Sequence, residues 1–215
     1  MNFFYILIPA LLIHIQAFCQ DFIPGIRIGV NACRLKSDEF SGSPRIGLDA
    51  GFTFTAVMGD KLDIISEMTF SQKGATLKGY DISGSDINYK MYYNSLQYAA
   101  IFNYYIKAPN LSLQAGPFFA YNLATPKSEA YFGKTKDPLT DISAETLADG
   151  ITGLDVGPAL GISGGTESVR LNARIMPGMI NYFKKVDYNG LGYKVTGATI
   201  HFSVSYLFNN VRVTR

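Results

Sequence analysis

Two side chains with catalytic potential lie close together near the C-terminal end, in the run His201-Phe202-Ser203. Residues two positions apart share one face of a β-strand, and a histidine beside a serine can activate the hydroxyl group as a nucleophile. A lipid-modifying hydrolase would need both side chains to face lipid, beside an acid. The alternation described below directs both to the opposite face. We therefore expect no enzyme, and a hydrolase is the second alternative function.

The sequence offers few residues for a metal site, a disulfide or another kind of catalytic site. The sequence holds two histidines and two cysteines, and one of each lies in the expected leader. The single remaining histidine is too few for a metal site built on histidine ligands. Cys33 is then a lone thiol that cannot form an intramolecular disulfide. The loop Asp81–Asp86 has too few acids for a calcium loop of the EF-hand type. We expect no cofactor, no metal and no catalytic residue.

Composition excludes several classes of protein. Of the 215 residues, 47% are hydrophobic and 17% are charged, whereas a typical soluble domain is about 25% charged. There is ample apolar content for an ordered fold, but no apolar run long enough for a membrane-spanning helix. The net charge of +2 comes without a basic cluster, so we expect no nucleic-acid partner.

The first residues resemble a secretion signal. An apolar stretch ends at Ala17-Phe18-Cys19, which fits the pattern of small residues before a cleavage site. A lipoprotein cysteine at position 19 is the alternative, although Phe18 stands where that processing needs a small residue. We divide the chain into a signal peptide (1–19), a β-barrel domain (20–208) and a short periplasmic tail (209–215).

Beyond the leader, apolar residues recur at every second position, which is the period of a β-strand. The clearest segment is 46–58, where every even position is apolar. In segment 91–105 the pattern is weakest, because Ile101 falls on the polar face and Asn94 on the apolar face. The alternation predicts eight strands, at about 25–34, 46–58, 62–75, 91–105, 111–123, 154–162, 169–177 and 198–208.

The connections between these segments alternate in length. Tight turns are expected at Gly59–Lys61, Lys107–Asn110 and Gly165–Glu167, and longer links near 35–44, 76–90, 124–150 and 183–194. Short turns at one end and long loops at the other are typical of transmembrane barrels. We therefore predict an all-β fold, an eight-stranded antiparallel up-and-down transmembrane β-barrel.

Alternation alone leaves open which face points inward, because a soluble lipocalin-like barrel has an apolar interior. Three features favour the membrane arrangement. The polar face carries many glycines and few large charges, as a narrow lumen requires. Tyrosine and phenylalanine gather near the strand ends, as they do in the aromatic girdles of membrane barrels. Third, only every second connection is long, and a secretion signal precedes the whole pattern.

Strand parity then places four acids and four bases in the lumen: Arg27, Asp49, Asp63, Glu67, Lys73, Asp155, Arg170 and Arg174. An eight-stranded barrel is just wide enough for its side chains to fill, and an unpaired buried ion costs several kcal/mol. We expect these charges to form a structural network that plugs the lumen. A gated or selective channel is the alternative.

Four stretches carry a resemblance to a known family: Glu67–Gly74, Gln114–Tyr121, Asp155–Gly161 and Ser205–Phe208. In them the chain resembles the porin-like outer-membrane β-barrel proteins of Bacteroidetes, which include PorT-type proteins. The resemblance covers nearly all of the mature chain and implies fold and location, without catalytic residues. Two departures are the absence of a Leu-x-Ile-Pro run at Ser95–Ala100 and the continuation of the chain past Phe208.

These features together predict a protein of the cell outer membrane with both termini in the periplasm. Its expected role is structural, surface-binding or accessory to envelope assembly or secretion, and a small-solute porin is the alternative. The expected partners are outer-membrane lipid and lipopolysaccharide, the outer-membrane assembly machinery, and a protein bound through the extracellular loop 124–150.

Overall fold

The computed structural model describes residues 21–37, 42–80, 86–107, 111–123, 127–129, 153–181 and 195–208. They form nine strands: β1 (Asp21–Ser37), β2 (Gly42–Val57), β3 (Leu62–Tyr80), β4 (Asp86–Lys107), β5 (Leu111–Asn122), β6 (Lys127–Glu129), β7 (Leu154–Gly165), β8 (Val169–Pro177) and β9 (Val195–Leu207). Within these ranges, no helix is long and apolar enough to cross a membrane.

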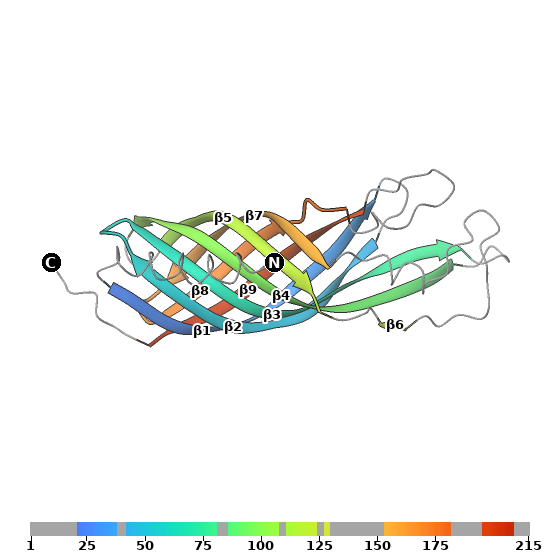
Figure 1. Cartoon of the computed structure of the whole chain (residues 1–215), viewed down its shortest axis with the longest axis horizontal. Coiled ribbons are helices and arrows are strands. Elements are labelled where there is room, and N and C mark those ends of the chain that lie inside the picture. The colour runs from blue at the N-terminus through green and yellow to red at the C-terminus, as the bar shows by residue number, and fades with distance from the viewer. Residues whose placement is uncertain are drawn as a thin grey trace, which may run out of the picture.

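Eight of the strands close into one antiparallel barrel (Figure 1). Around the ring their order is β1, β2, β3, β4, β5, β7, β8 and β9, and the pairing of β1 with β9 closes it. Closure gives each strand two partners, as a sheet surrounded by hydrocarbon requires. The ninth strand, β6, pairs outside the ring with residues Lys90–Tyr92 of β4. The predicted eight-stranded antiparallel barrel is confirmed.

Tight turns lie at one end of the barrel, which we call the turn end. Between β2 and β3 the Met58 amide donates to the Leu62 carbonyl at 3.0 Å, and between β7 and β8 the Thr166 amide donates to the Val169 carbonyl at 2.8 Å. Gly59 and Gly165 have positive φ values of 142° and 146°, a backbone conformation that favours glycine. The predicted turns at these two glycines are confirmed, whereas residues 108–110 lie outside the described part of the chain.

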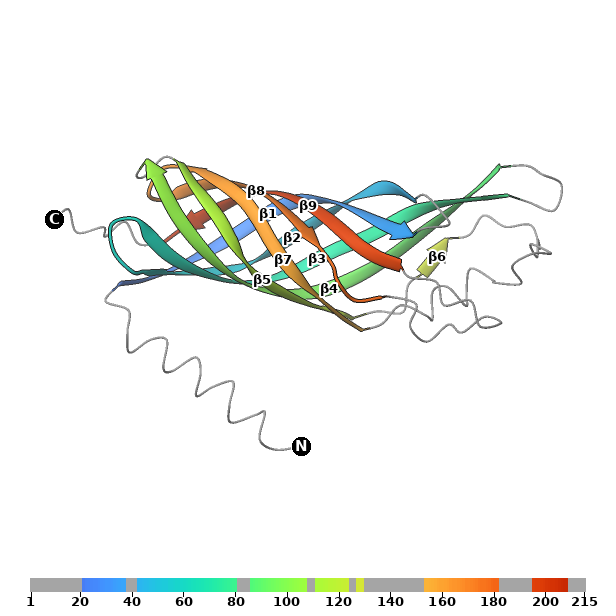
Figure 2. The same cartoon turned by 90° about the horizontal axis from the view of Figure 1, so that it is seen from above.

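The opposite end, which we call the loop end, differs from the prediction at the link 76–90. There β3 and β4 stay paired from Leu62 and Tyr104 as far as Tyr80 and Asp86, so only residues 81–85 connect them. This hairpin projects past the other strands (Figures 1 and 2). The prediction of a link here was wrong, although Ile87, Tyr89 and Met91 alternate with Asn88 and Lys90 as they would in a strand. The candidate calcium loop and most of the links 124–150 and 183–194 lie outside the described residues.

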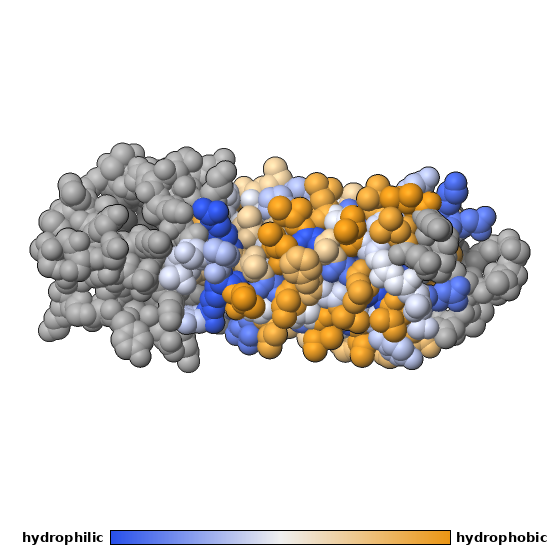
Figure 3. Space-filling view, turned by 180° about the vertical axis from the view of Figure 1, so that it is seen from behind, coloured by the Kyte–Doolittle hydropathy of each residue, from blue (hydrophilic) through white to orange (hydrophobic). Residues whose placement is uncertain are grey.

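Apolar side chains cover the outside of the barrel. Ile46, Leu171 and Phe202 are 75%, 60% and 55% exposed, and hydrophobic residues gather along the middle of the cylinder in Figure 3. One member of the even-numbered set 46–58 departs from this rule. Ala56 is buried, because it lies directly across from Phe22, whose ring stacks on Phe54.

Candidate functional site

The lumen is the candidate functional site, because it gathers all eight charged residues singled out by strand parity. Every one of them is buried. They come from five strands: Arg27 on β1, Asp49 on β2, Asp63, Glu67 and Lys73 on β3, Asp155 on β7, and Arg170 and Arg174 on β8. The structure brings them into three groups along the lumen, and their formal charges sum to zero.

Glu67 is the centre of the first group. Its Oε2 atom accepts a hydrogen bond from Arg27 Nη1 at 2.5 Å and a second from Arg174 Nη1. Arg174 Nη2 donates to the other carboxylate oxygen, Oε1, at 3.0 Å, so this pair is bidentate. Such charge-assisted pairs have both greater strength and stricter geometry than neutral hydrogen bonds.

The bond between Glu67 and Arg174 crosses the full width of the barrel. Glu67 lies on β3 and Arg174 on β8, and these two strands are four positions apart in either direction around the ring of eight. The same two strands are joined again nearer the turn end, where Arg170 Nη2 lies 3.9 Å from Asp63 Oδ2. Two ion pairs between opposite walls therefore cross the lumen. We call them the charged bridges.

The charged bridge nearer the turn end, between Asp63 and Arg170, is supported by an aromatic residue. The Tyr105 hydroxyl group donates to Asp63 Oδ2 at 2.5 Å, and the Arg170 guanidinium carbon lies 5.0 Å from the centre of the Tyr105 ring. Asp63 thus has two partners from other strands, and Arg170 has a cation–π contact in addition to its acid.

Asp49 extends the first group toward β9. Arg27 Nη2 lies 3.3 Å from Asp49 Oδ2, and His201 Nδ1 lies 3.7 Å from Asp49 Oδ1. Arg27 Nε also donates to the Ser203 hydroxyl oxygen at 2.8 Å. His201 and Ser203 are both buried in the lumen, on the side of the wall that parity assigned to them and away from lipid.

The third group lies toward the loop end. Lys73 Nζ donates to Gln97 Oε1 at 3.1 Å and lies 6.0 Å from the centre of the Phe118 ring. Asp155 is buried on β7 toward the same end, with its carboxylate beside Gly178. Cys33, the lone thiol of the expected mature chain, is buried with its sulfur 3.6 Å from the Tyr93 hydroxyl oxygen.

Amide side chains are the functional residues that the sequence reasoning missed. Gln114 accepts from Arg174 Nε at 2.5 Å and donates to Asn103 at 3.0 Å and Asn172 at 3.2 Å. Asn172 in turn donates to the Ser205 hydroxyl oxygen at 3.1 Å. These residues occupy the lumen side of their strands, so the parity that identified the charges would also have identified them.

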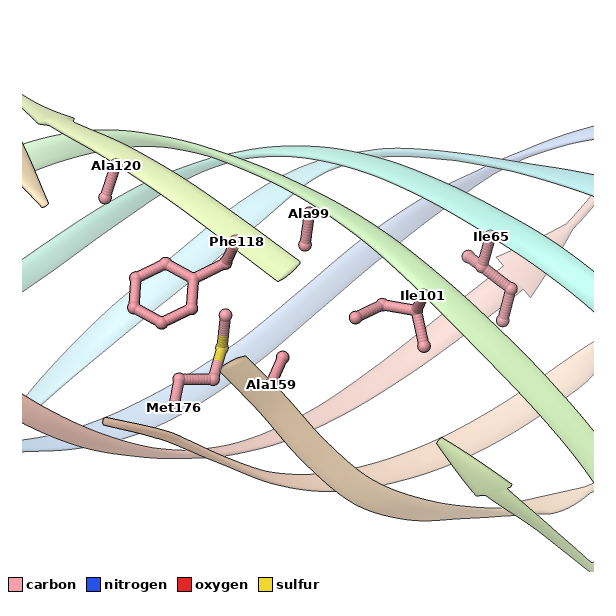
Figure 4. Packing of buried hydrophobic residues seen from close by; sticks show 7 residues of the cluster. All are labelled: Ile65, Ala99, Ile101, Phe118, Ala120, Ala159 and Met176. Atoms are coloured by element: carbon pink, nitrogen blue, oxygen red, sulfur yellow. The ribbon is translucent and has the colours of Figure 1, made fainter. Parts of the chain in front are cut away.

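Buried apolar side chains form a cluster in the lumen. Its members are buried and come from β3, β4, β5, β7 and β8: Ile65, Ala99, Ile101, Phe118, Ala120, Ala159 and Met176. The Phe118 ring and the Met176 side chain lie close to each other, with Ala159 beside them (Figure 4). Ile101, which interrupted the predicted alternation, belongs to this cluster. The apolar and charged side chains are interspersed, since Ile65 lies between Asp63 and Glu67 on β3 and Gln97 Nε2 lies 3.6 Å from Met176 Sδ.

Comparison with known proteins agrees with this architecture. A family model described as "Outer membrane protein beta-barrel domain" matches residues 18–209. No match was found among curated proteins. Among solved structures, the chain is similar in fold to the attachment invasion locus protein Ail of Yersinia pestis, solved in complex with the heparin analogue sucrose octasulfate (13% identity, 88% of this chain and 100% of that chain, TM-score 0.45).

Two further solved structures are similar to the chain. Neisserial surface protein A is 12% identical, with 85% of this chain and 96% of that chain covered and a TM-score of 0.48. OprG from Pseudomonas aeruginosa is 15% identical, with 87% and 95% covered and a TM-score of 0.40. Since the family model spans nearly the whole chain, this protein belongs to the outer membrane protein β-barrel family.

Proposed function

We propose that this protein is a closed, non-enzymatic anchor of the outer membrane that presents its loop end for binding at the cell surface. The observation that carries the proposal is the bidentate pair of Glu67 and Arg174 across the full width of the lumen. A solute passing through would have to break this bridge, and also the bridge of Asp63 and Arg170. Separating a buried ion pair leaves uncompensated charges, which is costly.

The loop end supports the binding part of the proposal. The β3–β4 hairpin projects beyond the barrel (Figure 2), and β6 pairs with β4 on that projection. Because β6 lies within the expected loop 124–150, part of this loop is docked on a rigid strand pair. Loops held by a rigid scaffold are where binding residues usually occur.

Several finer expectations belong to this proposal. The secretion signal at 1–19 would deliver the chain to the assembly machinery of the outer membrane, and both termini would lie in the periplasm. Lipid and lipopolysaccharide would surround the apolar outer face, and a protein partner would bind the loop end. The resemblance to PorT-type proteins of Bacteroidetes favours an accessory role in envelope assembly or secretion. His201 and Ser203 lie in the lumen, which supports a role without lipid hydrolysis.

Conductance in planar lipid bilayers tests the closed lumen. The wild-type protein should give no stable conductance steps, and a variant that lacks both bridges (Asp63→Ala, Glu67→Ala, Arg170→Ala and Arg174→Ala) should give them. Leu171→Ala, which changes only an outward side chain, serves as the matched control and should behave as the wild type does. Stable open channels in the wild type would contradict the proposal and favour the small-solute porin.

Pull-down from native outer membrane tests the binding role. The wild-type protein should retain a partner that a variant with a short Gly-Ser linker in place of residues 124–150 loses. Equal retention by both forms would place any partner away from this loop and overturn that part of the proposal.

A further inference from the structure

Two hydroxyl groups lie on the outer face of the barrel, within its apolar band. Ser66 on β3 and Tyr98 on β4 point outward, because their neighbours Glu67 and Gln97 face the lumen and are buried. Ser66 is the middle member of the outward run 62–70 of β3, whose other outward members are all apolar. The two hydroxyl groups therefore lie in hydrocarbon, away from both surfaces of the bilayer.

The two hydroxyl groups form a hydrogen bond that leaves one hydrogen unused. The Ser66 hydroxyl donates to the Tyr98 hydroxyl oxygen at 3.1 Å. Each hydroxyl has one hydrogen to donate, so the Tyr98 hydrogen still needs an acceptor. Within the described part of the chain, Tyr98 makes no other hydrogen bond. Exchanging donor and acceptor would leave the Ser66 hydrogen unused instead.

The acceptor for this hydrogen has to come from another protein molecule. Hydrocarbon contains no water that could accept it. The hydrocarbon core of a bilayer is about 30 Å thick, and the ester and headgroup oxygens of lipids lie at its two surfaces. Acyl chains carry no acceptor at the depth of Ser66. A protein surface with an oxygen at the same depth is therefore the partner that fits.

Small side chains beside the hydroxyl groups leave them accessible. Ala100 lies directly opposite Ser66 in the β3–β4 register, and its side chain is much smaller than those of Met68 and Phe102 nearby. Tyr98 keeps 36% of its surface exposed. Proteins within a bilayer associate through close packing at small residues and through hydrogen bonds, as membrane helices do. This part of the outer face offers both.

We propose that this protein forms a two-fold symmetric dimer in the membrane through β3 and β4, closed by a ring of four hydroxyl groups. Ser66 of each copy donates to its own Tyr98, and Tyr98 donates to Ser66 of the other copy. Every hydroxyl then donates once and accepts once, so no polar hydrogen is left in hydrocarbon. A two-fold axis brings the same patch of both copies together. Because both copies insert in the same orientation, the axis runs along the bilayer normal.

The opposite wall shows why the contact is confined to one side of the barrel. The outward residues of β8 in the bilayer are Val169, Leu171, Ala173 and Ile175, which have no hydroxyl group. A dimer through that wall would gain no hydrogen bond. The proposed contact also involves no lumen residue, so it is independent of the closed lumen, which conductance tests.

Energy transfer between labelled copies in phosphatidylcholine vesicles tests the dimer. In a Cys33→Ala background, donor and acceptor dyes are attached at Glu167→Cys in the exposed turn between β7 and β8. Energy transfer should rise with the protein-to-lipid ratio and reach a plateau. Tyr98→Phe removes only the hydroxyl group and should weaken dimerisation by about tenfold, since two hydrogen bonds within the membrane are lost per dimer. Tyr104→Phe, at an exposed tyrosine of the same strand, is the matched control and should dimerise as the wild type does.

A second variant separates the ring from a general effect of tyrosine. Ser66→Ala should weaken dimerisation about as much as Tyr98→Phe. The double variant should weaken it little further, because residues that share one hydrogen-bond network do not act independently. Folding of each form is checked by its migration on gels with and without boiling.

Cross-linking locates the contact. Ala100→Cys and Ala173→Cys are prepared in the Cys33→Ala background and treated in vesicles with a short, membrane-permeant bis-maleimide. Both alanines are half-buried on the outer face, but Ala173 lies on β8 and serves as the control. We expect Ala100→Cys to join two copies at a several-fold higher yield.

Three results would overturn the inference. The first is a wild type that stays monomeric at every protein-to-lipid ratio, which would leave this face to lipid or to a different protein. The second is a dimer that Tyr98→Phe and Ser66→Ala do not weaken relative to Tyr104→Phe. The third is an equal yield of cross-linked product from Ala100→Cys and Ala173→Cys.

Discussion

The wall formed by β9, β1 and β2 and the wall formed by β5, β7 and β8 present similar apolar surfaces to the bilayer, but their inner faces differ. The first lines the lumen with Arg27, Asp49 and His201, and its ladders are continuous between β9 and β1. The second carries Asp155, Arg170 and Arg174 as well, but adds the apolar side chains Phe118, Ala159 and Met176 and the three prolines Pro117, Pro158 and Pro177. Alternation is common to both walls and fixes only which side chains face lipid.

The difference shows that two separate kinds of interaction hold one cylinder together. Ion pairs connect β3 with β8, two strands that the backbone does not join directly. Packing of Phe118 and Met176 adds apolar contacts in the wall formed by β5, β7 and β8, where the prolines lack amide donors. Variants that remove one kind of interaction at a time should separate the two walls.

The largest effect is expected from Glu67→Ala. The change leaves Arg27 and Arg174 in the lumen without their shared acid, and breaking a buried ion pair in this way costs about 3–5 kcal/mol. Urea unfolding, followed by gel mobility without boiling, measures the loss. Thr69→Ala, two residues further along the same strand and also buried, is the matched control and should cost far less. Equal losses would show that the bridges contribute little.

A charge on the outer face should have the next largest effect. Leu171→Arg places a guanidinium group toward lipid, which costs about 2–4 kcal/mol at the middle of a bilayer. Glu167→Arg, in the exposed turn between β7 and β8, is the control and should cost about 0–1 kcal/mol. If Leu171→Arg were as stable as this control under urea, the assignment of the outer face to lipid would be wrong.

The smallest effect is expected where the two walls differ in backbone hydrogen bonding. The β7–β8 register of Leu160 with Ile175 places Pro158 opposite Pro177 when it is continued by two residues. Pro158→Val with Pro177→Val therefore adds two amide donors to this ladder and should raise the free energy of unfolding by about 1–2 kcal/mol. Pro117→Val restores one donor to the β4–β5 ladder and should give about half that gain. A loss of stability in both variants would mean that the rigid proline backbone matters more than the missing bonds.

The sequence was sufficient for the strand pattern and for the side of the wall on which each charge lies, because both depend only on the period of two. It could not predict that Glu67 meets Arg174, since this contact depends on strand order and stagger around the closed ring. Parity assigns a residue to a face without giving its height along the lumen. The same limit applies to the amide chain around Gln114.

Two other features were hidden for different reasons. Ile101 was visible as an exception to the alternation, but only the three-dimensional arrangement shows that Phe118 and Met176 lie with it. The prolines were visible in the sequence, but their alignment into a row appears only once Pro117 and Pro158 are known to be partners. The extension of β3 and β4 beyond the barrel was also visible in part, since Ile87, Tyr89 and Met91 alternate with Asn88 and Lys90, but the segment was interpreted as a long link.

A double-mutant cycle between Glu67 and Arg174 tests the central claim that the lumen is bridged from wall to wall. Unfolding free energies are measured for the wild type, Glu67→Gln, Arg174→Met and the double variant. The bidentate pair predicts a coupling energy of about 2 kcal/mol or more, since residues that share a buried ion pair do not act independently. Additivity within about 0.5 kcal/mol would contradict the bridge, and with it the closed lumen.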